Sequence, residues 1–278
     1  MEQMNPVQYK PEQNSSNRPV SFRRISGAEM TPSSSTSDPS APEPLDFDRL
    51  WNFADPAATE QKFREFLPRV AAESRSRELE LLTQIARTLG LQRKFDAAHQ
   101  LLNEVEAEAL TASPLVQQRY LLERGRVFNS SGQPEQSRPL FLAAWELSRQ
   151  GGDDYFAVDA AHMLGIIEPP SEQLAWNLKA LAIAEAASAP GARRWLGSLY
   201  NNIGWTYHAL GQNETALAIF EKAVAWREAA GQAEELRIAR WCVARILRAL
   251  DRVEEALALQ RQLADELAAT QASDGYVL

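Results

Sequence analysis

The chain has 278 residues, of which 45% are hydrophobic and 24% charged, with one cysteine and a formal net charge of −8. This is a globular composition, long enough for one elongated domain or two small ones. A single cysteine excludes an intramolecular disulfide framework and a multi-cysteine zinc site, the acidic balance argues against general binding to nucleic acid or anionic lipid, and no apolar run reaches the ~18 residues of a membrane span.

Residues 1–44 differ in composition from the rest of the chain. They contain seven of the 15 prolines, nine serines and none of the seven tryptophans. Because they offer too little apolar surface to offset the entropy of ordering, we predict a disordered tail. Residues 1–13 have no apolar stretch of the kind found in a secretory signal, so we expect a cytoplasmic protein.

The segment 45–72 is predicted to be a helical lead-in that acts as a cap. Asp55 and Pro56 form a typical helix start, with an N-cap carboxylate followed by proline at the first helical position. Its apolar residues suit a cover for the helices that follow, and they are Trp51, Phe53, Phe63, Phe66 and Leu67. The sequence leaves open whether the part around Trp51 covers those helices or folds across their binding face.

The region 73–270 is predicted to be helical throughout. Alanine, leucine, glutamate, glutamine and arginine dominate it, and the alternation typical of strands is missing. Segments of roughly 15 to 20 residues, a common helix length, lie between glycine- and proline-containing breaks. These breaks are at 132–134, 168–171, 189–191, 211–213 and 230–232. The remaining residues, 271–278, are expected to be a short tail.

The decisive feature is an internal repeat, which is clearest in residues 199–223. A small residue, Gly204, precedes Tyr207 by three positions, and a turn follows at Gly211. The next helix carries small and aromatic residues at i, i+4 and i+7, which are Ala216, Phe220 and Ala223. Small residues let two antiparallel helices approach closely, and the larger ones fill the groove beside them.

The same pattern occurs five times along the chain, counting this copy. Equivalent positions in the second helix of each unit are Val105, Ala144, Ala180, Ala223 and Leu263, which are 39, 36, 43 and 40 residues apart. Residues 74–269 therefore resemble the tetratricopeptide repeat family, whose usual period is about 34 residues. The longer period and the pair Asn201–Asn202 resemble the kinesin-light-chain type. The resemblance implies an all-α, right-handed α-solenoid of about five antiparallel helical pairs.

The resemblance also implies a concave groove lined by the first helix of each pair, which binds an extended peptide or a helix. We call the residues that directly follow each small position the floor row, and they are Arg87, Arg126, His162, Trp205 and Arg245. Neighbours on the same face are Asn201, His208, Trp241 and Arg248. This set is basic and aromatic in an acidic protein, so we expect it to attract an acidic partner.

Each of these residues also has a purely structural interpretation. Arg126 has Glu123 at i−3, and Arg245 has Asp251 and Glu254 within reach of the next turn, so both arginines could simply form ion pairs along their own helices. Tryptophans in repeats often pack in the core or between repeats. The sequence alone does not choose between packing and binding for Trp205 and Trp241.

A second row lies beside the floor row, two residues before each small position. We call it the adjacent row, and it holds Gln84, Glu123, Asp159, Asn202 and Cys242. The resemblance implies that asparagine in this row bonds to a peptide backbone, since an amide both donates and accepts. Because the two acids would repel an acidic peptide, we expect a divided groove with residues 199–250 as its cationic and aromatic half.

The sequence contains no pattern that indicates catalysis. The three histidines are scattered, no phosphate-binding glycine loop occurs, and helical glutamates are those of a solvated surface. We therefore predict no catalytic residue, metal or cofactor, and a scaffold or adaptor that binds a protein or peptide. The alternative from another class is a regulatory sensor that binds a small molecule or a partner domain.

The last predicted helix raises one further possibility. Its apolar residues Val253, Ala256, Leu257, Leu263 and Leu267 have no following helix to pack on. Some of them are expected to pack on the preceding helix. The others would allow a homodimer through this C-terminal helix, or a structural role in self-assembly.

Overall fold

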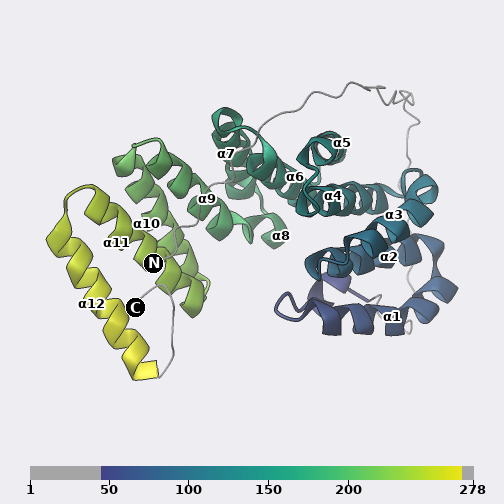
Figure 1. Ribbon diagram of the computed structural model, residues 1–278, viewed down its shortest axis with the longest axis horizontal. Helices are drawn as coiled ribbons and strands as arrows, with labels where there is room; N and C mark the ends of the chain where they lie inside the picture. Colours follow the sequence, from purple (N-terminus) through teal and green to yellow (C-terminus); the bar gives the residue numbers. More distant parts are fainter. Residues whose placement is uncertain (1–44, 271–278) are drawn as a thin grey trace. The chain divides into compact units, whose positions relative to one another are not determined.

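The computed structural model describes residues 45–270 (Figure 1), and the predicted tails 1–44 and 271–278 lie outside the described residues. Every regular element between 45 and 270 is a helix. The elements are η1 (Phe47–Leu50), α1 (Pro56–Glu73), α2 (Arg75–Leu91), α3 (Phe95–Ala109), α4 (Pro114–Ser130), α5 (Pro134–Gly151), α6 (Asp154–Ile167), α7 (Pro170–Ala186), α8 (Pro190–Arg193), α9 (Leu196–Ala209), α10 (Asn213–Ala229), α11 (Ala233–Ala249) and α12 (Val253–Thr270).

Local capping explains where several helices begin. The Asp55 carboxylate accepts a hydrogen bond from the Ala58 N–H at the start of α1, and Pro56 occupies the first helical position. Ser74 and Asp153 cap α2 and α6 in the same way. Each cap satisfies a backbone donor that the helix itself leaves without a partner.

The helices pack as five consecutive pairs, which confirms the predicted all-α solenoid. The pairs are α2–α3, α4–α5, α6–α7, α9–α10 and α11–α12. In the first four pairs the second helix also contacts the first helix of the next pair, so the pairs stack one after another in chain order (Figure 1). The four-residue α8 lies against α6 and α7, and α1 contacts α2.

Close approach within a pair depends on glycine, as the repeat pattern predicts. A Cβ atom at Gly204 would lie 2.6 Å from Cζ of Phe220, which is fully buried. Gly125 and Phe141 repeat this contact in the α4–α5 pair. The small and large residues of the pattern therefore interlock across each of these pairs.

In four of the five pairs between residues 45 and 270, the turn between the two helices contains a left-handed residue. Gly132 and Gly211 have positive φ at the breaks predicted from the sequence. Arg93 and Asp251 take the same place in the first and last pairs, each with φ of 61°. The sequence analysis did not identify these two turns, because neither residue is the usual glycine for this conformation.

Candidate functional site

The floor row lies on the five first helices, with one residue on each of α2, α4, α6, α9 and α11. The structure divides the predicted site residues into three groups along these helices. Arg87 and Arg126 form the amino-terminal group, and His162, Asn201 and Asn202 form the middle group. The carboxyl-terminal group contains Trp205, His208, Trp241, Arg245 and Arg248.

The amino-terminal group is neutralised by carboxylates of the adjacent row. Glu123 Oε1 lies 3.1 Å from Nη1 of Arg87 and 2.7 Å from Nη1 of Arg126. Arg126 also pairs with Asp159 on α6. Burial alone would lower the pKa of Arg126, but the charges of Asp159 and Glu123 outweigh it and raise that pKa. These side chains are only 24% and 15% exposed, so little of either charge reaches solvent.

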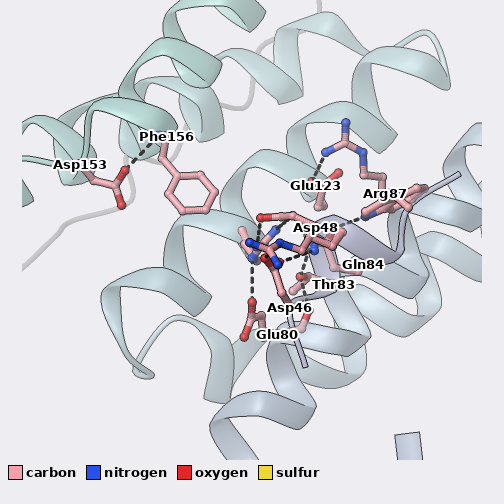
Figure 2. Close-up of polar contacts among 12 residues, drawn as sticks. Asp46, Asp48, Glu80, Thr83, Gln84, Arg87, Glu123, Asp153 and Phe156 are labelled. Atoms are coloured by element: carbon pink, nitrogen blue, oxygen red, sulfur yellow. Dashed lines mark hydrogen bonds and ion pairs between the residues drawn. The ribbon is translucent and has the colours of Figure 1, made fainter. Parts of the chain in front are cut away.

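Residues 46–53, which we call the strap, cross the first-helix face of the first two pairs. Asp48 accepts two hydrogen bonds from the Arg119 guanidinium of α4, at 3.1 and 2.9 Å. The Trp51 indole N–H donates to Gln84 Oε1 of the adjacent row at 3.0 Å. Glu80 of α2 lies 3.1 Å from Nε of the same Arg119 guanidinium, so Asp48 and Glu80 lie close together (Figure 2). The strap thus covers the start of both rows.

Aromatic contacts fasten the strap to the floor row. The rings of Trp51 and Phe53 stack with centroids 4.8 Å apart, and the Arg87 guanidinium lies 5.4 and 5.3 Å from their centroids. Phe47 is buried beneath Arg77. The sequence left open whether the segment around Trp51 covers the helices that follow or folds across their face. The structure shows both arrangements in the lead-in, because α1 packs on α2 while the strap folds across the first-helix face.

The middle group lines a cavity of about 460 Å³ between α6, α9, α10 and α11. The His162 ring lies 5.0 Å from that of Trp195, and its buried Nδ1 has no hydrogen-bond partner among the described residues. Burial lowers the pKa of His162, so the neutral ring is favoured. The Asn202 amide also has no side-chain hydrogen bond within the described residues, which leaves it available to a ligand.

Asn201 differs from its neighbour because its side chain is engaged. Its Oδ1 accepts a weak hydrogen bond from the Cys242 thiol at 3.7 Å. Burial raises the pKa of Cys242 to about 12, so the thiol stays protonated and is a poor nucleophile.

Trp205 connects the carboxyl-terminal group to the core. Its half-buried ring lies 5.3 Å from Phe220 in the core, 6.1 Å from Trp241 and 5.7 Å from His208. The His208 Nδ1 is hydrogen-bonded to Asn213 Oδ1 at 2.6 Å. One side of this aromatic group therefore packs against the core.

The two arginines of this group are exposed, and neither forms an ion pair with any residue between 45 and 270. The acids nearest in sequence, Asp251 and Glu254, do not pair with Arg245. Both arginines line a cavity of about 300 Å³ between α11 and α12, together with Trp241. Their positive charge is thus available to a ligand, unlike that of Arg87 and Arg126.

The sequence analysis missed residues that surround the strap. Tyr155, Arg194 and Trp195 line a cavity of about 230 Å³ with Trp51 and Arg87. Arg119, which anchors Asp48, was not considered either. It lies two turns before Arg126 on the same face of α4, so helical spacing alone would have placed it beside the floor row.

Two observations bear on other classes of site. In the part of the chain that the structure describes, no group of three or more histidine, cysteine or acidic side chains is arranged to hold a metal ion. None of the described helices combines the length and apolar character needed to span a bilayer.

Comparisons with known proteins agree with this geometry. Residues 197–229, which include the α9–α10 pair, match the tetratricopeptide repeat family. The crystal structure of BtubC (BKLC) from P. vanneervenii superposes with a TM-score of 0.63 and 17% identity, over 83% of this chain and 94% of that chain. A Podosopora anserina protein with nearly identical TPR-like repeats, named after kinesin light chain, gives a TM-score of 0.59 and 20% identity, over 72% and 100% of the two chains.

The search of curated proteins by sequence found no match. The resemblance predicted from the repeat pattern is nevertheless confirmed by the family match and by the fold. Residues 197–229 form a tetratricopeptide repeat, and the chain shares the α-solenoid fold of kinesin-light-chain-like repeat proteins.

Proposed function

We propose that this protein is a non-catalytic interaction module that binds an acidic peptide or helix of another protein. The fold supports the general role, since tetratricopeptide repeats generally act as protein–protein interaction scaffolds. The ligand would lie along the first helices from α9 to α11, with its backbone on Asn201 and Asn202. Trp205 and Trp241 would supply rigid aromatic contacts. A cytoplasmic location stays a prediction.

The observation that carries this proposal is the charge of Arg245 and Arg248, which are exposed and form no ion pair with any residue between 45 and 270. Arg87 and Arg126 are satisfied by Glu123 and Asp159, so an acidic ligand gains little from them. At Arg245 and Arg248, no carboxylate of residues 45–270 competes with the ligand for the guanidinium. A planar guanidinium can bind a carboxylate of the ligand through two hydrogen bonds.

The test is a double charge reversal, Arg245→Glu with Arg248→Glu, in the full chain. Wild type and variant are used to capture proteins from native lysate, and the eluates are compared by quantitative mass spectrometry. The matched control reverses two exposed arginines on α1, Arg64→Glu with Arg69→Glu, and has the same net charge. We expect proteins that the wild type and the control retain and the variant loses.

Circular dichroism spectra of the three proteins should coincide, which excludes unfolding as the cause of the loss. The proposal is wrong if all three proteins capture the same partners, or if none captures any. The captured protein is then cut into overlapping peptides, and the bound peptide should be rich in aspartate and glutamate.

The cavity around His162, Asn201 and Asn202 favours a second candidate, a sensor of small molecules. Its volume of about 460 Å³ lies within the range of ligand pockets. Thermal-shift screening of metabolite mixtures against wild type and Asn202→Ala tests it. A stabilisation that the variant lacks would favour the sensor over the scaffold.

A further inference from the structure

The outer side of α12 is uncovered where earlier second helices are covered. Leu257 is 46% exposed, whereas Leu217, at the equivalent position of α10, is only 6% exposed because α11 packs over it. Val253, one turn before Leu257, is 52% exposed. Among the described residues no helix follows α12, so the surface that elsewhere receives the next first helix has no occupant.

Inside the solenoid, floor-row arginines form ion pairs between consecutive first helices. Arg87 on α2 pairs with Glu123 on α4, and Arg126 on α4 pairs with Asp159 on α6. In both cases the floor-row arginine receives a carboxylate from the adjacent row of the next first helix. Arg245 occupies the same floor-row position on α11, is exposed, and has no acid within the described residues to pair with.

Apolar and charged features meet at one cavity of about 300 Å³ between α11 and α12. Trp241, Ala244, Val253, Ala256 and Leu257 supply its apolar lining, and Arg245 and Arg248 supply its charge. A helix that packed on α12 as α11 packs on α10 would cover Leu257. It would also carry its adjacent-row residue to Arg245.

We propose that this end of the solenoid docks a helix of a partner protein in the position of a next first helix. The docking face of that helix carries an aspartate or glutamate for Arg245, and apolar side chains that cover Val253 and Leu257. Charge complementarity defines the occupant, because an uncharged helix would leave Arg245 without the carboxylate that Arg87 and Arg126 both have. This surface goes beyond the proposed peptide groove, since it includes the outer side of α12.

The chain itself supplies a defined probe. A peptide of residues 153–167 reproduces the cap and helix α6, whose Asp159 pairs with the floor-row residue Arg126. The control is the same peptide with Asp159→Asn, which removes the charge and keeps the shape. Both peptides bear the same cost of helix formation, so the ratio of their affinities reports the carboxylate alone.

Fluorescence anisotropy with labelled peptides and the full-length chain measures the binding. We expect the native peptide to bind about tenfold more tightly than the Asp159→Asn peptide, as a charge-assisted hydrogen bond predicts. Arg245→Gln should abolish that difference. Leu257→Ser should weaken both peptides, whereas Leu210→Ser, an equal change at another exposed leucine, should weaken neither.

Several results would overturn the proposal. They are no binding of the native peptide, equal affinity for the two peptides, or an affinity ratio that Arg245→Gln leaves intact. Binding that occurs only after removal of residues 271–278 would make the chain's own tail the occupant. A dimer in sedimentation velocity that Leu257→Ser dissociates would make a second copy the occupant.

A further variant separates this inference from the groove proposal. Asn202→Ala lies in the groove and away from α12, so it should leave the peptide affinities unchanged while it weakens a groove ligand. If the chain binds a groove ligand but not the helix peptide, the docking proposal fails. If it binds the helix peptide but no groove ligand, the groove proposal fails.

Discussion

The two ends of the floor row use the same residue type for different purposes. Near the amino terminus, Arg87 and Arg126 are held by carboxylates and, at Arg87, covered by the strap. Near the carboxyl terminus, Arg245 and Arg248 are exposed and have no ion pair among residues 45–270. An arginine of the floor row is therefore a candidate for binding only where the next first helix does not supply a carboxylate to it. The charges of the two amino-terminal arginines are compensated by Glu123 and Asp159, and our proposal places ligand binding at the carboxyl-terminal arginines.

The largest difference between the two ends should appear when one floor-row arginine is removed from each of them. Arg126→Met leaves the buried Asp159 without its cation and leaves Glu123 with Arg87 alone, and we expect a loss of about 3–5 kcal/mol in the free energy of unfolding. Arg245→Met removes an exposed charge that has no ion pair among residues 45–270, and it should change stability by less than about 0.5 kcal/mol. Urea denaturation measures both. Equal losses in the two variants would break the contrast between the ends.

A packing change should affect both ends alike. Gly125→Ala and Gly204→Ala each place a Cβ against a buried phenylalanine ring, and overpacking of this kind costs about 1–3 kcal/mol. Gly151→Ala is the control, because a Cβ there meets no atom within 4 Å. Thermal unfolding of the three variants measures the effect. A cost at only one end would mean that packing, as well as charge, distinguishes the two ends.

The strap should contribute less, and only at the amino-terminal end. Asp48→Asn weakens the charge-assisted bonds to buried Arg119, and we expect a loss of about 1.5 kcal/mol. Asp46→Asn, the same change two residues earlier, retains a capping side chain and should be almost neutral. Chemical denaturation of both variants provides the measurement. Neutral behaviour of Asp48→Asn would mean that the strap is held by its aromatic residues alone.

The smallest effect should be a pH dependence from His162, between the two ends. Because burial lowers its pKa in the folded state, the unfolded chain takes up the proton first as the pH falls. Stability should therefore decrease as the pH falls through about 6.5, the ordinary value for histidine. The decrease between pH 7.5 and 5.5 should be smaller in His162→Gln, by less than about 1 kcal/mol. An identical decrease in both proteins would contradict it.

Much of the fold could be predicted because the repeat can be recognised from the spacing of residues within short segments of the sequence. The spacing of Gly204 and Phe220 predicts two closely packed helices. Five such patterns at similar intervals along the sequence indicate a solenoid. The turns at Arg93 and Asp251 could not be recognised in this way, because a left-handed residue without glycine has no clear sequence signal.

Within the candidate site, only ion pairs between residues of the same helix could be predicted from the sequence. The pairing of Arg126 with Glu123, three residues earlier, follows from helical periodicity. The same argument suggested Asp251 or Glu254 as a partner of Arg245, and the structure shows neither pair. Spacing says which side chains share a face, but it does not say which of them are drawn to a neighbouring helix.

The sequence by itself determined the helices, their pairing and the rows of side chains along the first helices. These depend on 3.6-residue periodicity, capping residues and the match of small with large side chains, which are all local. Only the tertiary structure decided which floor-row arginines are compensated by carboxylates of neighbouring helices and which are not. Asp48 meets Arg119 across 71 residues, and Asp159 meets Arg126 from the next pair. Such contacts depend on how the pairs stack, because burial and charge compensation are properties of the assembled surface.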